Sequence, residues 1–240
     1  MQDHEMNNQN GIKQINGEVL DRITDLKEGE IVTFGSYMQD EDPSKESKPI
    51  EWIVLSVEEN RVLLFSRYVL DVVPYHKDKR YRPWKSCTIR KWLNKDFYKK
   101  AFTDSERRLI RETNLKNEDF IYFFNPANTD TKDRIFPLSK EELKFCIHVK
   151  GERYAEATPF ALKKGVTTHL VDEELYDKLN MSEDGVDRDV IGLTVTEWWV
   201  RSNADGWKTV DHAWIFGARG GAKTIYDGKT GVRPALYVGR

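Results

Sequence analysis

The last part of the chain, residues 196–240, limits most strongly what this protein can fold into. It begins with an aromatic stretch, residues 198–202, and ends with the apolar run 232–238 close to the C-terminus. Glycine-containing turn sequences separate the runs between them: Asp205-Gly206, residues 217–221 and Asp227-Gly228. Short β-rich runs separated by Gly and Asp turns predict an antiparallel meander. Because the chain ends on an apolar strand, we expect that strand to lie in the core.

The first third of the chain also carries strand patterns. Residues 30–37 are expected to form a first strand, and residues 40–48 a charged loop. Residues 49–57 alternate apolar and polar side chains, and after a turn at Glu59-Asn60 the chain returns over residues 61–68. This pattern predicts a β-hairpin. The chain is therefore expected to be β-rich at both ends.

Short helices are predicted between these two regions. Ser86 is placed to cap a helix over residues 88–98. The capping-box spacing, which starts a helix by satisfying its first backbone N–H groups, occurs twice: Thr103 to Glu106 and Ser139 to Glu142. Thr158-Pro159 predicts a further helix that ends at Gly165. Residues 114–134 are expected to form a long polar loop.

Length and composition favour one α+β domain behind an N-terminal tail. The 240 residues, 39% of them hydrophobic, suffice for one large domain, and no internal repeat or linker divides them. Residues 1–27 are expected to be a flexible tail, with a short helix suggested by the spacing of its apolar side chains: Val19, Leu20, Ile23 and Leu26. Residues 28–240 are expected to form the single domain.

Charge and hydropathy exclude some partners and locations. The net charge of −2 gives no reason to expect nucleic acid or an anionic membrane. No window approaches 18 apolar residues, so no membrane span is expected. The N-terminus lacks a signal-peptide pattern, which predicts a cytoplasmic protein, or an exported or cell-surface one if a signal segment was removed. Cys87 and Cys146 are expected to be buried thiols, with one disulfide as the alternative.

Four ordered blocks carry a resemblance to a known family. They are residues 49–55 with 63–66, residues 84–94 with Phe97 and Phe102, residues 133–142, and residues 199–202 with 231–236. Together they resemble an uncharacterised bacterial domain family whose members share the C-type-lectin-like fold. That fold is also used by formylglycine-generating enzymes (sulfatase-modifying factors) and by variable proteins of diversity-generating retroelements. The resemblance covers roughly residues 28–238.

The resemblance implies a fold and a place for a ligand. It implies twisted antiparallel sheets, two or more short helices and long irregular loops. Retroelement variable proteins present ligand-contacting side chains from a C-terminal segment, whose nearest equivalent here is residues 201–226. Formylglycine-generating enzymes use a cysteine pair near the C-terminus. No cysteine follows Cys146 here, so the resemblance does not extend to that chemistry.

The aromatic and basic side chains of the terminal segment could form a recognition surface. Large rigid rings give contact area at small entropic cost, and arginine adds planar hydrogen bonding. The predicted ligand contacts are Trp199, Arg201, Asn203, Trp207, Asp211, His212, Trp214, Arg219 and Tyr226. Alternation along the strand puts Trp198 on one face and Trp199 with Arg201 on the other, so at least one tryptophan is expected in the core. The alternative is that these rings only stabilise the fold. Arg90 and Arg233 are expected to hold loops in place.

No metal ligand set or catalytic residue is predicted. Two loops, residues 183–189 and 128–133, gather oxygen ligands of the kind that calcium prefers, but neither follows the EF-hand spacing. Acidic, solvated loops explain both, with calcium as the alternative. Asp211-His212 could act as an acid/base pair, but a polar turn residue beside a core strand is the favoured explanation.

These patterns favour a non-enzymatic module that binds an unknown protein or glycan ligand. Two alternatives stay open. One is a metal- or oxygen-dependent enzyme related to the formylglycine-generating group. The other is a structural accessory domain of a bacterial assembly. The binding hypothesis rests mainly on fold analogy.

Overall fold

The structure, a computed structural model, describes residues 12–79, 82–117, 130–146, 155–180, 188–203, 209–213 and 219–239. Its strands are β1 (Lys13–Gln14), β2 (Ile31–Tyr37), β3 (Lys48–Val57), β4 (Arg61–Ser66), β5 (Asp71–Val72), β6 (Thr113–Leu115), β7 (Thr131–Asp133), β8 (Thr168–Leu170), β9 (Thr194–Thr196), β10 (Trp198–Asn203), β11 (Thr209–Ala213), β12 (Arg219–Thr224), β13 (Gly231–Val232) and β14 (Ala235–Gly239). The α-helices are α1 (Gly17–Asp21), α2 (Thr88–Trp92), α3 (Tyr98–Ala101), α4 (Asp104–Leu109), α5 (Lys140–Cys146), α6 (Pro159–Lys163) and α7 (Glu173–Asn180). Single turns of 3₁₀-helix cover Ile23–Asp25, Trp84–Ser86 and Arg188–Val190, and a π-helical turn, Leu93–Phe97, joins α2 to α3.

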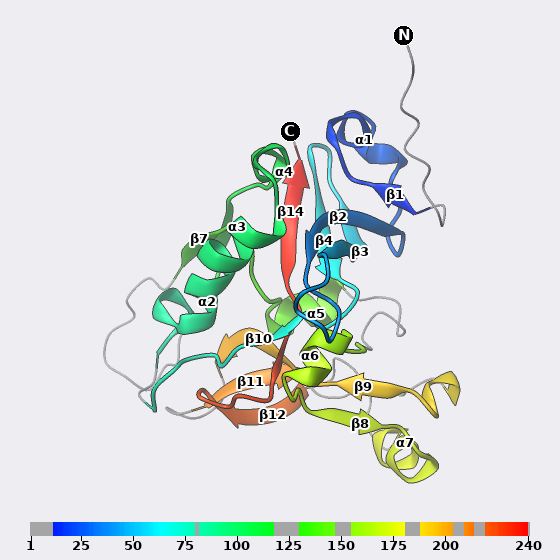
Figure 1. Cartoon of the computed structure of the whole chain (residues 1–240), viewed down its shortest axis with the longest axis vertical. Coiled ribbons are helices and arrows are strands. Elements are labelled where there is room, and N and C mark those ends of the chain that lie inside the picture. Colours follow the sequence, from blue (N-terminus) through cyan, green and yellow to red (C-terminus); the bar gives the residue numbers. More distant parts are fainter. Residues whose placement is uncertain are drawn as a thin grey trace.

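Two five-stranded sheets form the framework (Figure 1). The upper sheet has the order β1-β2-β3-β4-β14, and the lower one, which we call the terminal sheet, has the order β12-β11-β10-β13-β5. β6 and β7 form a separate antiparallel pair, as do β8 and β9. Strand β14 pairs with β4 along its whole length and lies between the β2–β4 strands and the helical segment α2–α4 (Figure 1). This mixture of antiparallel sheets and short helices confirms the expected α+β class.

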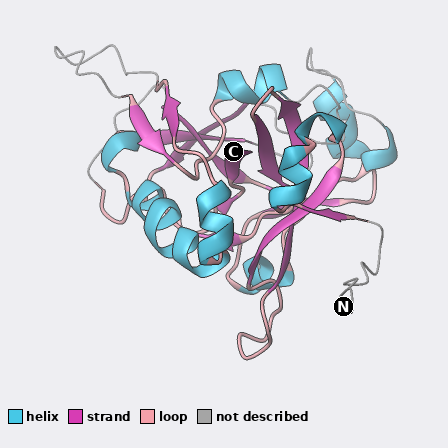
Figure 2. Cartoon of the chain, turned by 90° about the horizontal axis from the view of Figure 1, so that it is seen from above, coloured by secondary structure: helices cyan, strands magenta, loops and turns pink. Residues whose placement is uncertain are grey.

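Both faces of the upper sheet are covered. All of β4 except Arg61 is buried, including residues on opposite faces of the strand. The helices lie around the outside of the strands (Figure 2). The apolar run at the end of the chain, β14, is buried as predicted, and Leu236 and Val238 have no exposed surface.

Local sequence signals explain most of the helix starts. Thr103 and Glu106 form the predicted capping box at the start of α4. Ser139 and Glu142 form the reciprocal bonds of the second box before α5. At α6, Thr158 caps, Pro159 occupies the first turn, and Gly165 follows the last turn with a φ of +80°. These three predictions are confirmed.

Three predictions differ from the structure. Ser86 does not cap α2, because it lies in a 3₁₀ turn and Cys87 precedes the helix without a side-chain cap. The helical segment extends to Ala101, past the predicted end at residue 98. The predicted loop over residues 114–134 contains most of the β6–β7 pair, whose short polar strands carry no alternating pattern.

The N-terminal segment from residue 12 onward packs on the domain. β1 pairs in parallel with β2, and four apolar side chains of the following turns are buried in the common core: Ile15, Leu20, Ile23 and Leu26. The expected short helix is present as α1 and a 3₁₀ turn. The amphipathic spacing thus marks residues that cover the edge of the upper sheet instead of belonging to a separate tail.

Gly35 is required by a close approach inside β2. Its φ is +67°, and an added Cβ would lie 2.5 Å from a ring carbon of Phe102 and 2.6 Å from the Ala101 carbonyl oxygen. We expect Gly35→Ala to lower the free energy of unfolding by about 3 kcal/mol, because left-handed strain and overpacking add. Gly165→Ala is the matched control, since it has a similar φ but no atom within 4 Å of the added Cβ. Urea unfolding of both variants measures the difference, and equal losses would contradict the packing argument.

Candidate functional site

Strand β10 forms the centre of the terminal sheet. Trp198 pairs with Ala213 and Trp199 with His212 on β11, and a register shift follows before Asn203. On its other side β10 pairs with β13, which brings Gly231 next to Trp198. The predicted meander is therefore only partly correct. β10, β11 and β12 form it, but β13 pairs with β10 in parallel and the apolar strand β14 lies in the upper sheet.

Both tryptophans of β10 are buried. Trp198 is 1% exposed and contacts the guanidinium of Arg233, which lies 4.9 Å from its ring centroid. Trp199 has no exposed surface, packs against Tyr75 with ring centroids 5.8 Å apart, and donates its indole N–H to the Val73 carbonyl at 2.9 Å. The expectation that one face of this strand is open to a ligand is therefore corrected. We do not retain Trp199 as a candidate ligand contact.

Arg201 is also an interior residue, 3% exposed. Its guanidinium donates to both carboxylate oxygens of Glu142 at 2.6 Å each. It also donates to the Asn117 side-chain oxygen at 3.0 Å and to the Pro137 carbonyl at 2.9 Å. A fork-shaped cation with this many acceptors fixes the segments that it joins. We therefore assign Arg201 a structural role, in place of the predicted ligand contact.

The other predicted contacts lie further along the same sheet. Asn203, Asp211, His212 and Arg219 are on β10, β11 and β12, whose backbones the structure describes. Trp207 and Trp214 lie outside the described residues. Tyr226 follows β12, is 39% exposed, and has the Lys79 ammonium 5.6 Å from its ring centroid. Of the predicted contacts whose side chains the structure describes, Tyr226 is therefore the one exposed to solvent and accessible to a ligand.

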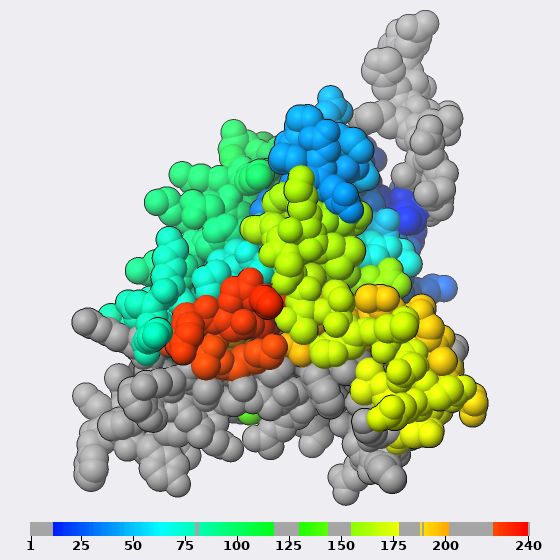
Figure 3. Space-filling model, turned by 60° about the horizontal axis from the view of Figure 1, so that its bottom comes forward, coloured from blue at the N-terminus to red at the C-terminus, as the bar shows by residue number. Residues whose placement is uncertain are grey.

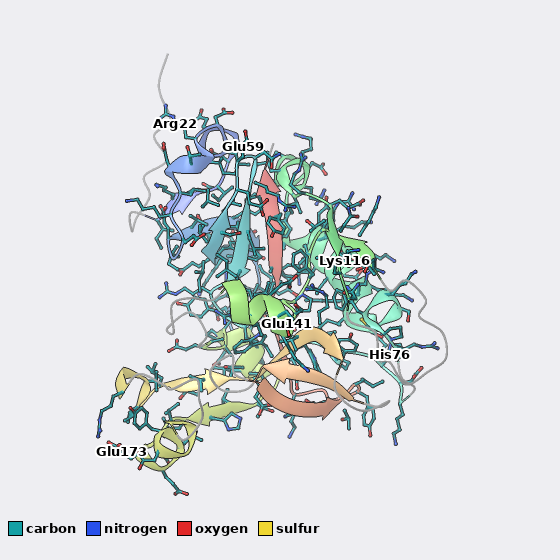
Figure 4. All side chains as sticks on the ribbon, turned by 180° about the vertical axis from the view of Figure 1, so that it is seen from behind. Arg22, Glu59, His76, Lys116, Glu141 and Glu173 are labelled. Carbon is teal, nitrogen blue, oxygen red and sulfur yellow. The ribbon has the colours of Figure 1, made fainter. Side chains whose placement is uncertain are left out.

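The turn that carries Tyr226 lies beside the segment that precedes α2. The His76 N–H donates to the Ile225 carbonyl at 2.7 Å. In Figure 3 this turn (orange-red) is at the surface next to the cyan-green segment, and Figure 4 shows His76 at the edge of the terminal sheet. The exposed turn after β12, which carries Tyr226, therefore lies beside the residues that precede α2.

A groove opens on that surface. Its volume is about 670 Å³, and it lies between the end of β5, the α2 segment and β7. Its lining residues are Val73, Lys77, Thr88, Arg90, Lys91, Trp92, Asn94, Lys95, Asp96, Lys132, Asp133 and Arg134. Val73, which accepts the Trp199 bond, connects the groove directly to the terminal sheet. We call this cavity the basic groove.

The floor of the basic groove is built around Asp133, which is 2% exposed. Its carboxylate accepts bonds from Arg90 Nε at 2.7 Å, from the Trp84 indole N–H at 2.9 Å and from the Thr131 hydroxyl at 2.6 Å. Arg90 also donates to the Lys85 carbonyl at 2.8 Å, and Arg233, completely buried, donates to the Ser66 carbonyl at 2.8 Å. The predicted structural roles of both arginines are confirmed.

Four lysines in the wall of the groove are exposed: Lys77, Lys91, Lys95 and Lys132. Among the residues that the structure describes, none of these ammonium groups forms an ion pair. Arg134, by contrast, pairs with Glu112 at 3.1 Å. Burial lowers the pKa of His76, whose Nδ1 lies 3.0 Å from the Thr88 hydroxyl, so its ring is neutral at pH 7. The positive charge of the groove at neutral pH therefore comes from its lysines and arginines.

Sequence reasoning missed the basic groove. Its cations come from three segments that are far apart in the chain, and each segment also contains acidic residues. The signal that was available is the pair Lys91 and Lys95, four residues apart on one helical segment and hence on one face. Lys132 lies on a strand that the sequence pattern did not reveal.

Neither loop considered for calcium gives a described ligand set. Asp130 pairs with Lys116 at 2.5 Å, and the Asp133 oxygens are occupied by the donors described above. Of the other loop, residues 183–187 lie outside the described residues. No cluster of three or more His, Cys, Asp or Glu side chains suited to a metal occurs in the described part of the chain.

A buried carboxylate beside the terminal sheet has two polar partners. Glu197, which precedes β10, is 4% exposed. Its oxygens lie 2.9 Å from His169 Nε2 and 2.5 Å from the Lys223 ammonium. These two contacts join β8, which carries His169, to β12, which carries Lys223. Glu197 therefore has a structural role in holding these elements together.

Cys87 is not a reactive thiol. It is free and completely buried, and burial raises its pKa to about 12. In a Cys146→Ser variant we expect a disulfide reagent at pH 8 to modify native Cys87 roughly a thousandfold more slowly than the urea-unfolded chain, since so little thiolate forms. Absorbance of the released thiol measures both rates. Equal rates would show that Cys87 is accessible and ionised.

Comparison with known proteins identifies a family. Residues 59–239 match the family described as Domain of unknown function (DUF6273), which is more than half of the chain. The chain belongs to the DUF6273 family. The DUF6273 region begins at the turn between β3 and β4, so it contains all of the basic groove and the terminal sheet. No curated protein and no solved structure matches the chain.

The DUF6273 match confirms the expected membership of an uncharacterised domain family, but it assigns no activity. Its start at residue 59 is later than the expected start near residue 28. Within the described residues, no helix has the length and apolar character needed to cross a lipid bilayer.

Proposed function

We propose that this protein is a non-enzymatic recognition module that binds a protein or glycan ligand where the terminal sheet meets the basic groove. The observation that carries the proposal is the groove itself. A concavity of about 670 Å³ has the size of a ligand site, and its charged lining offers several groups to a polar ligand. It adjoins the exposed Tyr226, the described part of the terminal segment that the sequence favoured.

The framework around the groove is suited to recognition because it is firmly held. Trp199 ties β10 to Val73 on the groove wall, and Asp133 ties β7 to α2 beneath it. A rigid base adds no cost of ordering the backbone to the free energy of binding. The exposed lysines and Tyr226 are then the adaptable groups that meet the ligand.

We further propose that the domain has a C-type-lectin-like fold. The first and last strands lie in one sheet, a mostly antiparallel sheet carries the terminal segment, and short helices flank both. These features support the proposal. An experimental structure compared with members of that fold tests it, and a different connectivity of the common strands would overturn it.

The binding proposal is tested by ligand capture with three matched variants. Parent protein is presented to a bacterial lysate and to a glycan panel. The variants are Trp207→Ala/His212→Ala for the terminal segment, Lys91→Gln/Lys95→Gln for the groove, and Lys99→Gln/Lys229→Gln as a control on exposed lysines outside the groove. Each variant must keep the parental melting temperature.

We expect a ligand that the parent and the control retain, and that the groove or terminal-segment variant loses. Retention by all four proteins would contradict the proposed site. Absence of any ligand from both sources would contradict the recognition function and favour a structural accessory domain.

A further inference from the structure

The basic groove has a charge opposite to that of the whole chain. The protein carries 38 basic and 40 acidic residues, a net charge of −2. The groove is lined by six basic side chains and two acidic ones, Asp96 and Asp133. Asp133 is buried beneath the groove and engaged by Arg90. Asp96 is therefore the exposed acidic group in this lining, against four exposed lysines.

Keeping these lysines together has an electrostatic cost. Like charges on one wall repel, and within the described residues no carboxylate pairs with Lys77, Lys91, Lys95 or Lys132. A concave surface also concentrates the field of its charges and so attracts ions of the opposite sign. The groove is consequently complementary to a negatively charged ligand.

The arrangement of the lysines indicates several separate negative charges. Lys77 lies before α2, Lys91 and Lys95 lie about one helical turn apart, and Lys132 lies on β7. A single phosphate or sulfate group is better matched by arginines that converge on one point, because their planar forks bind it through two bonds. Flexible ammonium groups distributed over three segments fit carboxylates distributed along a chain.

We infer that the basic groove binds an acidic polypeptide segment, one that carries several Asp or Glu side chains. This inference rests on the recognition function proposed above and names the class of its ligand. Trp92, half-buried in the groove wall between the lysines, gives such a segment an apolar contact for one of its own side chains. Tyr226 with Lys79 extends the surface beyond the groove.

The test is fluorescence anisotropy of the full chain with a labelled poly-glutamate peptide. A poly-glutamine peptide of equal length and a polygalacturonate oligomer of equal charge are the comparison probes. We expect poly-glutamate to bind, poly-glutamine not to bind, and affinity to fall steeply between low and physiological salt. Lys91→Gln/Lys95→Gln should weaken binding about tenfold, and Lys99→Gln/Lys229→Gln should leave it almost unchanged.

A variant of opposite sign separates charge from folding. Asp96→Asn removes the exposed negative charge of the groove lining and should tighten poly-glutamate binding about twofold, which a damaged fold cannot do. Equal weakening by the groove and control variants would overturn the inference. Stronger binding of polygalacturonate than of poly-glutamate would also overturn it, while the recognition function would stand. If the capture experiment finds no ligand and poly-glutamate does not bind, both proposals fail.

Discussion

Arg201→Ala should lower the free energy of unfolding by about 3 kcal/mol, because it breaks an ion pair whose arginine is buried and removes the charged donor of several interior hydrogen bonds. The guanidinium joins β10 to Glu142 at the start of α5, and it also satisfies acceptors at Asn117 and Pro137. Removing it takes the charged donor from Glu142, Asn117 and Pro137 and creates a void beside Phe136, whose ring centroid lies 5.6 Å from the guanidinium carbon. Urea unfolding followed by tryptophan fluorescence measures the loss.

Two companions make the Arg201 result specific. Arg201→Lys keeps the charge but loses the two-bond geometry to Glu142, so an intermediate loss is expected. Arg134→Ala removes an arginine whose pair with Glu112 is exposed, and it should cost less than about 1 kcal/mol. If Arg201→Ala were as stable as the parent, the structural role assigned to Arg201 would be wrong and the predicted ligand contact would return.

Asp133→Ala is expected to cost a similar amount, about 3–5 kcal/mol, since it leaves the charge of Arg90 without its buried partner. The Trp84 indole N–H and the Thr131 hydroxyl lose their acceptor in the same substitution. Unfolding in urea measures this loss, and Asp133→Asn, which retains one acceptor oxygen, should recover part of it. A loss below about 1 kcal/mol for Asp133→Ala would show that Asp133 and Arg90 do not form a buried charge pair.

The Asp133 result also bears on the groove. Arg90, released from Asp133, adds an uncompensated cation beneath the lysines. In any variant at this position that remains folded, binding of an anionic probe should therefore become no weaker. A decrease in binding at full foldedness would mean that the groove depends on its shape and not on its charge.

The parts of the fold that sequence reasoning predicts well are those with local causes. The hairpin β3–β4 follows from alternation around Glu59-Asn60, and the starts of α4, α5 and α6 follow from capping residues. The family blocks were informative for a physical reason that only the structure reveals. Asp133 accepts hydrogen bonds from Trp84 and Arg90 of another block, and Arg201 donates to Glu142 of another block. Hydrogen bonds between the blocks therefore connect segments that are distant in the sequence.

What sequence reasoning could not predict depends on tertiary contacts. Alternation along β10 suggested one open face, but Val73 and Tyr75 cover one tryptophan and Arg233 covers the other. β6 and β7 are short and polar, so they have no apolar period to recognise. The basic groove combines β7 with the α2 segment and the residues after β5, and its charge is visible only after these three segments are brought together.

The recognition site is tested most directly by hydrogen–deuterium exchange, measured with and without the poly-glutamate probe. The account predicts slower exchange on binding at the groove segments, in α2 and the following turn and in β7, with a further effect in the turn that carries Tyr226. The upper-sheet strands β2 and β3, which are remote in sequence from the groove lining, serve as the internal reference. Protection confined to the β8–β9 arm or to the upper sheet, with the groove unchanged, would contradict the account.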